Sequence, residues 1–584
     1  MRALRAKGVS EDALGAAVAL AIGIGAGLGA VLFRWMIVSF TKLFFDTGGD
    51  VLGFMGDTYV IVIPAIGGTI VGLLVYFGAR EAKGHGVPEV MAAVAFNGGR
   101  IRMRVAVVKS LASAICIGSG GSAGREGPIV QIGSAIGSNV GQRLHLHQEW
   151  VRTFVACGAA GGIAATFNAP IAGTFFALEI ILRHYAVKSI GLVLVSAVTS
   201  AVIAELILGD EVAFTVPHYV IASGWEFPLY ALLGMLAALT ASGFIFLLYK
   251  LEDIFDMVPI PDYVKPAIGG LALGGIGFFY PQVFGVGYGV IDQALVGEIG
   301  LGMLAALVFL KLLATSLTLG SGGSGGVFAP SLFMGAMLGG AFGVVVNQWF
   351  PGATAPSGAY ALVGMAAAFA GGSRAPITAI VILVEMTRNY ESILPLGIAV
   401  LASTVVSRVI RKDSIYTIKL RRRGLSLPDE VQQHALSLVS VSSVMNTGYP
   451  VVRDTASLPQ LASLFSGTGR TGFPVVDESD CLVGVVTLSD LSNSGGDPQF
   501  VADIATTDLV IAYPDQSVHD ALAQLGGMEV GRIPVVTRGD SAHLLGVVGR
   551  AELVRAYANA VGDGQAAKTR ETRVPLQTPE QVEV

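Results

Sequence analysis

Two distant stretches of this chain carry almost the same glycine-rich sequence. Residues 118–128 read GSGGSAGREGP, and residues 320–330 read GSGGSGGVFAP, 202 residues later. A second pair follows at nearly the same separation, because API at 169–171 returns at 375–377. The pattern predicts that much of the chain folds as two copies of one design.

The composition is that of a membrane protein. Of 584 residues, 53% are hydrophobic and 14% are charged, which is far from the usual balance of a soluble domain. Apolar runs long enough to span a bilayer, which needs about 20 residues, occur at 14–38, 57–78, 189–209, 228–249, 302–319 and 391–409. Matching glycine- and proline-broken segments in the two halves of such a protein point to a binding site at the bilayer midplane.

Two apolar segments that follow the glycine loops are shorter. Residues 128–142 and 330–346 are predicted to begin inside the membrane or to cross it partway. Backbone can end at that depth only where protein or a polar cavity satisfies its amides. The segments are therefore expected to border either protein or a polar cavity, and their small residues also fit close helix packing.

Basic residues cluster at both ends of the apolar region. One cluster is Arg2, Arg5 and Lys7, and the other runs from Arg411 to Arg423. Basic residues concentrate on the cytoplasmic side, so both ends are predicted to be cytoplasmic, with an even number of crossings. We expect a bacterial inner membrane.

The sequence after residue 440 is a second, shorter tandem repeat. GFPVVD and GVVTLSDL in the first unit return as GRIPVV and GVVGRAEL in the second. Short β-branched strands alternate with amphipathic helices at 458–465 and 518–525, and the pattern resembles a pair of CBS domains. We expect a linker at 426–440, CBS domains at 441–497 and 498–558, and a disordered tail at 559–584.

Each glycine loop ends in a proline, at Pro128 and Pro330. Proline is well suited to the start of a helix, and glycines let the backbone approach a ligand closely. The free N–H groups and the positive dipole end of each helix would then face the loop. Two such starts together predict an anion site without a full positive charge, which suits weak binding during conduction. The alternative is that both loops only pack helices.

Glu126 breaks the match between the two loops, because its counterpart is Phe328. A carboxylate at membrane depth is costly and is a functional candidate. It could occupy the place of the anion and leave when protonated. The alternative is an ion pair with Arg125, although adjacent side chains usually diverge. A third loop, GHGVPE at 84–89, places His85 ahead of another helix start.

Taken together, these motifs resemble the CLC family of chloride channels and proton/chloride antiporters, over about residues 10–425. The matching motifs are GREGP at 124–128, GVFAP at 326–330, GHGVPE at 84–89, VEMT at 384–387 and Tyr416. The resemblance implies an α-helical multi-pass membrane protein, an inverted-repeat bundle with broken and re-entrant helices, followed by a cytoplasmic α/β CBS pair. It implies a membrane domain at 1–425 with repeats at 57–209 and 228–409, and a homodimer with one anion path in each subunit.

The resemblance also assigns the site. It makes Glu126 the external gating glutamate. The chloride ligands that it implies are His85, Gly86, Arg125, Gly127, Val327, Phe328, Ala329 and Tyr416.

Two residues depart from the family pattern. His85 stands where the family has a central serine: a neutral imidazole could donate one N–H to chloride, and a protonated one would hold it harder. Ile180 stands at the internal proton-acceptor position of the antiporters, next to Glu179. Isoleucine cannot carry a proton, which favours a gated chloride channel or weak proton coupling. A proton-coupled antiporter, and a carrier for nitrate or fluoride, stay open as alternatives.

In the CBS pair the resemblance implies a site for ATP, ADP or AMP. Thr487 and Asp490 fit the ribose-binding motif, whereas Gly549 and Glu552 in the second unit lack the hydroxyl. A structural dimerisation module is the equal alternative. The chain shows no phosphate-loop or serine-protease motif and no HExxH, so we expect neither an enzyme nor a metal site. A magnesium channel is disfavoured, because hard cations need more carboxylates than the broken segments hold.

Overall fold

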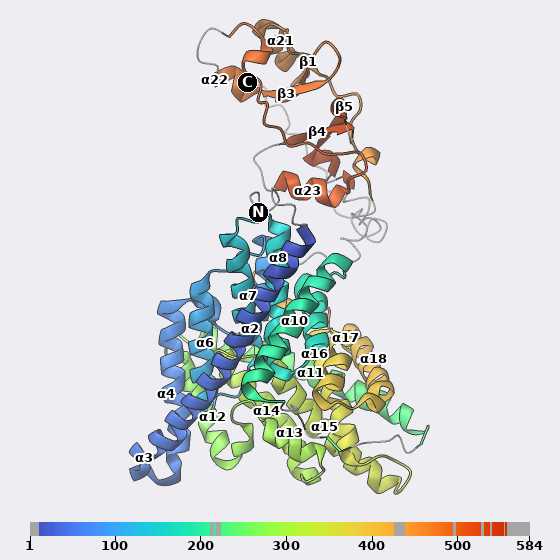
Figure 1. Cartoon of the computed structure of the whole chain (residues 1–584). Helices are drawn as coiled ribbons and strands as arrows, with labels where there is room; N and C mark the ends of the chain where they lie inside the picture. The colour runs from blue at the N-terminus through green and yellow to red at the C-terminus, as the bar shows by residue number, and fades with distance from the viewer. Residues whose placement is uncertain are drawn as a thin grey trace, which may run out of the picture. The chain divides into compact units, whose positions relative to one another are not determined.

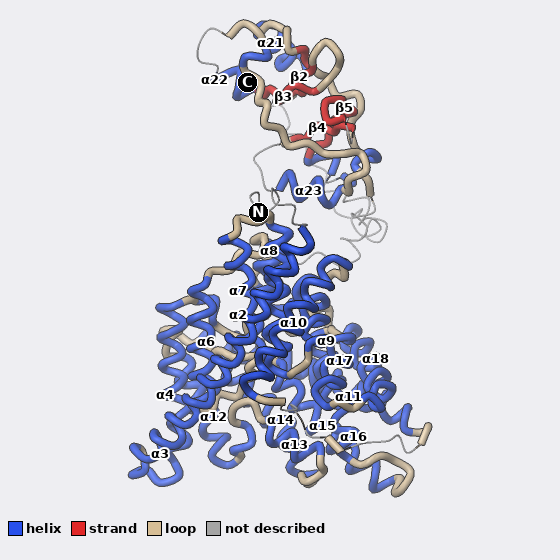
Figure 2. Tube along the Cα trace, in the orientation of Figure 1, coloured by secondary structure: helices blue, strands red, loops and turns tan. Residues whose placement is uncertain are grey.

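The structure is a computed structural model that describes residues 11–210, 214, 216–217, 223–425, 439–493, 498–526, 531–537, 540–553 and 555–556. Contacts divide the chain into two units, residues 1–427 and 428–584, which are described separately. Most of the expected linker, all of the expected tail and the basic cluster at residues 2–7 lie outside the described residues. Helices build the described part of the first unit, and the strands lie in the second (Figure 2).

The helices of the first unit fall into two series (Figure 1). The first comprises α2 (Glu11–Thr41), α4 (Tyr59–Leu73), α5 (Val87–Phe96), α6 (Met103–Gly118), α7 (Glu126–Arg143), α8 (Gln148–Phe167), α9 (Pro170–Phe176), the π-helical turn η5 (Ala177–Leu182) and α10 (Val187–Leu208), with η1, α3 and η2 (42–58) between α2 and α4. The second comprises α11 (Glu226–Met257), α12 (Lys265–Phe279), α13 (Tyr288–Leu295), α14 (Leu301–Gly320), α15 (Phe328–Trp349), α16 (Ser357–Ser373), α17 (Pro376–Thr387), α18 (Ile393–Ile410) and α19 (Thr417–Arg422).

Eight helical segments in the described part are long and apolar enough to cross a membrane. Six of them correspond to the six predicted runs, and α8 and α15 were not predicted as spans. For α15 the expected end at residue 346 is wrong, because the helix begins at Phe328 and continues to Trp349. The sequence hides α8 because alanine and glycine, rather than leucine, line a helix that is mostly buried in protein.

The two series cross at glycines of α4 and α12. A Cβ atom on Gly68 would lie 2.3 Å from the carbonyl oxygen of Pro266, and one on Gly270 would lie 2.2 Å from that of Pro64. Each contact is the other displaced by 202 residues, so the helices meet across a pseudo-two-fold axis. Small residues allow this backbone approach in membrane helices.

The two glycine loops meet in the same symmetric way. Gly124 and Gly326 exchange backbone hydrogen bonds, with N···O distances of 2.8 and 2.6 Å. Two buried hydroxyl pairs repeat the exchange: Ser113 with Ser324, and Ser122 with Thr315. The duplication seen in the sequence is therefore an interlocked pair of copies.

The outer helices also match. α2 packs on α8 and α10, as α11 packs on α16 and α18. We propose on this basis that the first copy begins with α2 rather than at residue 57, so that the copies run from α2 to α10 and from α11 to α18.

The second unit holds two small sheets. In one, β1 (Val452–Arg453) pairs in parallel with β2 (Gly472–Val476), which pairs antiparallel with β3 (Leu482–Thr487). In the other, β4 (Arg532–Thr537) pairs antiparallel with β5 (Asp540–Gly549). The predicted helices are present as α21 (Leu458–Thr468) and α23 (Val518–Gly526), and α22 (Leu488–Asn493) follows β3 directly.

Candidate functional site

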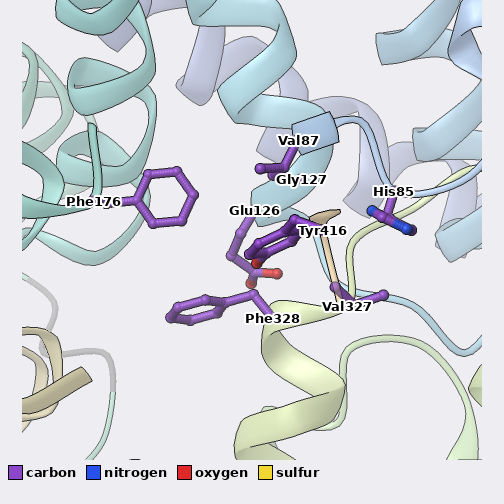
Figure 3. Close-up of a pocket in the computed structure, with 8 residues that line it drawn as sticks. All are labelled: His85, Val87, Glu126, Gly127, Phe176, Val327, Phe328 and Tyr416. Carbon is purple, nitrogen blue, oxygen red and sulfur yellow. The ribbon is translucent and has the colours of Figure 1, made fainter. Parts of the chain in front are cut away.

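Four helix starts converge on one narrow cavity, because α5, α7, α15 and α19 begin beside it. The cavity is lined by His85, Val87, Glu126, Gly127, Phe176, Val327, Phe328 and Tyr416 (Figure 3). It thus brings together six of the nine residues that the sequence assigned to gating and chloride binding. The lining side chains leave no space for a water-sized molecule.

Glu126 fills the centre of this arrangement. Its side chain is buried, Oε1 accepts a hydrogen bond from the Tyr288 hydroxyl at 2.5 Å, and Oε2 accepts one from the Ala329 amide at 3.3 Å. The Ala329 amide belongs to the first turn of α15, where the free N–H groups and the helix dipole favour negative charge. The carboxylate therefore lies where an anion would bind.

The other three assigned residues lie next to the cavity. Ala329 contributes the amide described above, and Gly86 has a φ of 77°, which favours glycine,. The Arg125 guanidinium lies 5.0 Å from the centre of the Tyr288 ring and donates to the Thr166 carbonyl at 3.3 Å. Arg125 is thus engaged with the surroundings of Glu126 rather than with its carboxylate.

Tyr288 is a site residue that the sequence reasoning missed. It begins α13 directly after Gly285-Val286-Gly287, and this loop repeats Gly84-His85-Gly86 201 residues later. Searching for a second copy of the loop at 84–89 would have identified Gly285–Gly287 and, after it, Tyr288. The same comparison shows that Val286 is the counterpart of His85.

Both of these loops are braced by a buried lysine. Lys109 and Lys311, 202 residues apart, donate from Nζ to two loop carbonyls each: Ala82 and Gly84 for the first, Val283 and Gly285 for the second. Each lysine thus links two backbone carbonyls of one loop, and buried carbonyls are nearly always hydrogen-bonded in native proteins. The lysines therefore hold the loops that carry His85 and Tyr288 in place.

His85 lies at another side of the cavity, with 3% of its surface exposed. Its Nε2 lies 3.2 Å from the hydroxyl of Tyr249 on α11, and its ring centre lies 6.0 Å from that of Tyr416. Tyr416 is also buried and immediately precedes α19. The proximity of Tyr416 agrees with the assignment of both residues to one site, whereas the contact with Tyr249, 164 residues away, was not expected from the sequence.

Glu179 caps a helix of the opposite copy. Its carboxylate accepts hydrogen bonds from the Ile377 amide and from the amide and hydroxyl of Thr378, at 2.7–3.3 Å. Glu385 returns the contact to the amides of Ile171 and Ala172. Carboxylates are favourable at helix N-termini, so these paired glutamates hold the two copies together.

Ile180 is 4% exposed in the π-helical turn η5, directly after Glu179. It places an apolar side chain at the position where the family resemblance implies a proton acceptor in antiporters. The neighbouring carboxylate is committed to the start of α17.

In the second unit the predicted nucleotide residues lie together. The amide and hydroxyl of Thr487 both donate to Asp490 Oδ2 at 2.7 Å, at the start of α22. Gly549 repeats the amide contact with Glu552 at 3.1 Å, without the hydroxyl.

Comparison with known proteins identifies a family for each unit of the chain. Residues 67–408 match the family described as voltage gated chloride channel, and residues 441–495 and 501–559 match CBS domains. Both units of the chain are therefore covered by a recognised family.

Three relatives show the range of named activities. The chain is 35% identical to a putative chloride channel protein ClcB-like of Ralstonia nicotianae, over 62% of this chain and 85% of the relative. It is 36% identical to the H(+)/Cl(-) exchange transporter ClcA of Vibrio cholerae, over 60% and 76%. It is 30% identical to the chloride channel protein CLC-f of Arabidopsis thaliana, over 84% and 72%.

Among solved structures, a slow cyanobacterial Cl−/H+ antiporter aligns with a TM-score of 0.66 at 25% identity, covering 71% of this chain and 98% of that one. A eukaryotic CLC transporter aligns with a TM-score of 0.64 at 21% identity, over 92% and 97%, which shows the shared fold. Because the family match spans more than half of the chain, this multi-pass membrane protein belongs to the voltage-gated chloride channel (CLC) family, with two CBS domains after its membrane unit.

Proposed function

We propose that this protein lets chloride cross the membrane through the cavity between the starts of α7 and α15, with Glu126 as its gate. The observation that carries the proposal is the hydrogen bond from the Ala329 amide to the Glu126 carboxylate at 3.3 Å. A carboxylate that uses a helix-start amide competes directly with an anion for the same donor.

The charge of the Glu126 carboxylate controls whether the anion site is open. Protonation removes the negative charge of Glu126 and with it most of the attraction to the α15 helix start. The side chain can then leave, and chloride takes its place against the backbone of Val327, Phe328 and Ala329, with Tyr416 beside it. Amides and hydroxyls hold an anion weakly enough for it to move on.

We propose a gated channel or weakly proton-coupled transport, because Ile180 cannot carry a proton. A chloride gradient across liposomes that contain the protein should drive no opposite proton flux at a fixed ratio. Parallel recordings from a chloride electrode and a pH electrode measure this. Proton movement in constant proportion to chloride would instead support the alternative of a coupled antiporter, and replacing chloride by nitrate or fluoride tests the anion.

Tyr288 should set the pH at which the gate opens. Tyr288→Phe removes a donor to the charged carboxylate, and such a bond contributes about 1.5–3 kcal/mol. Glu126 then protonates more readily, so the midpoint of pH-activated chloride flux should move to higher pH by about one unit. The exposed Tyr390 offers a control, since Tyr390→Phe should leave the midpoint in place. An unchanged midpoint in Tyr288→Phe would contradict this role.

We also propose that the CBS pair regulates transport by binding an adenine nucleotide at Thr487 and Asp490. The hydroxyl and carboxylate lie 2.7 Å apart, close enough to share the two hydroxyls of a ribose. Calorimetry on the full-length protein should show ATP, ADP or AMP binding that Asp490→Ala removes, whereas Glu552→Ala retains it. No heat at millimolar nucleotide would favour a purely structural dimerisation module. A homodimer, and an inner membrane with both termini cytoplasmic, remain part of the proposal.

A further inference from the structure

The hydrogen bonds around His85 determine which of its nitrogens carries the proton. The Tyr249 hydroxyl donates its single hydrogen to the Ile415 carbonyl at 2.8 Å. Its oxygen can therefore only accept from His85 Nε2, 3.2 Å away. A neutral imidazole has one N–H, so the network assigns that hydrogen to Nε2 and leaves Nδ1 with a bare lone pair.

Nδ1 is a buried atom without a hydrogen-bond partner among the residues that the structure describes. Buried polar atoms of this kind are rare, and each calls for an explanation. His85 lines the cavity with Glu126 and Tyr416 (Figure 3). A bare nitrogen at this position repels an anion, whereas a protonated one would donate a charge-assisted hydrogen bond to it.

Charged groups surround the imidazole from several elements. Burial first, and then the charges of Lys419 on α19, Lys109 on α6 and Arg423 after α19, lower the pKa of His85 well below its usual value. Glu89 on α5 pairs with Arg423 at 2.7 Å and lies 4.0 Å from Lys419, so it is shared between cations. Glu126 also faces the cavity. A second proton on the imidazole would join this positive cluster, and an anion in the cavity is the partner that offsets it.

We propose that His85 is a proton-dependent anion ligand, which takes one proton from solvent onto Nδ1 as chloride arrives and returns it as chloride leaves. The inference rests on the proposed function, because it takes the cavity as the chloride site. Proton and chloride then strengthen each other's binding by the same factor. This linkage is separate from the gate, where protonation removes a competing charge from Glu126.

Isothermal titration of full-length Glu126→Gln protein with chloride isolates the effect, because the gate no longer titrates. Because burial and the nearby cations lower the pKa of His85, the titration extends from about pH 4.5, below the range where histidine ordinarily changes charge, to about pH 7.5. Over this range chloride affinity should fall with rising pH. The limit for one linked proton is about tenfold per pH unit. Repeating the titration in two buffers of different ionisation enthalpy should show uptake of up to about one proton per chloride.

Two further substitutions separate this role from a structural one. His85→Ser, in the Glu126→Gln background, should bind chloride with an affinity that no longer depends on pH. Tyr249→Phe keeps the histidine but removes the acceptor at Nε2, so the neutral ring can place its hydrogen on Nδ1, and the pH dependence should weaken. His147, exposed before α8, provides the control, since His147→Ser should leave the dependence intact.

Three results would overturn the inference: chloride affinity in Glu126→Gln that is independent of pH with no proton uptake, no chloride binding at the lowest pH of the titration, or an unchanged pH dependence in His85→Ser. Chloride flux through the unaltered protein in liposomes would persist in each case, and the proposed function would stand. Absence of that flux would instead remove the proposed function itself.

Discussion

Glu126→Gln is expected to raise chloride flux at neutral pH by about tenfold or more and to abolish its dependence on pH at the side from which Glu126 is protonated. The charged carboxylate holds its place through Tyr288 and Ala329, and hydrogen bonds to a charged group contribute about 1.5–3 kcal/mol each. Losing one such contribution already corresponds to about tenfold in occupancy. Glutamine has nearly the same shape but no charge to titrate.

The measurement is chloride efflux from liposomes, with the pH varied on one side at a time. If the efflux rate of Glu126→Gln still depends on the pH at the other side of the membrane, that dependence should disappear in the double variant with His85→Ser. Glu298→Gln, at an exposed carboxylate before α14, serves as the control and should behave like the unaltered protein. An efflux rate in Glu126→Gln that still follows the pH on both sides, as it does before substitution, would exclude this gate.

The sequence was most informative where glycine and proline determine the backbone. The loops at 118–128 and 320–330 predicted two helix starts that face one another, and the structure brings them together through Gly124 and Gly326. A proline that follows a glycine-rich loop favours the start of a helix. The two copies of this pattern were therefore recognised from the single sequence, without an alignment. Membrane spans were harder to predict where small residues make up the helix. The span α8 was missed because its alanines and glycines face protein.

Only part of the site could be predicted from the sequence, because several of its contacts join residues that are far apart in the chain. Glu126 was visible because a carboxylate in an apolar repeat is costly. The partners that govern it and His85 come from elements far along the chain, Tyr288 on α13 and Tyr249 on α11. A tyrosine at a membrane helix has many ordinary uses, so only the three-dimensional contacts distinguish these two.

The pseudo-two-fold axis leads to a prediction about stability. Gly270→Ala would place a Cβ atom 2.2 Å from the Pro64 carbonyl oxygen, a distance that the backbones of α4 and α12 can relieve only by moving apart. Overpacking of this kind costs about 1–3 kcal/mol, and thermal unfolding in detergent should show it as a lower midpoint. Gly275→Ala on the same helix meets nothing within 4 Å, so it should be neutral or stabilising by up to about 1 kcal/mol, because alanine favours the helix.

Gly68→Ala extends the test to the other copy, where the new Cβ would lie 2.3 Å from the Pro266 carbonyl oxygen. If the copies share one interface, Gly68→Ala and Gly270→Ala should lower the midpoint by similar amounts. The two sites belong to one crossing, so the double variant should lose less than the sum, since the first substitution already separates the helices. Equal midpoints for Gly270→Ala and Gly275→Ala would mean that the crossing relaxes without cost. The close approach of α4 and α12 would then contribute nothing measurable to the stability of the fold.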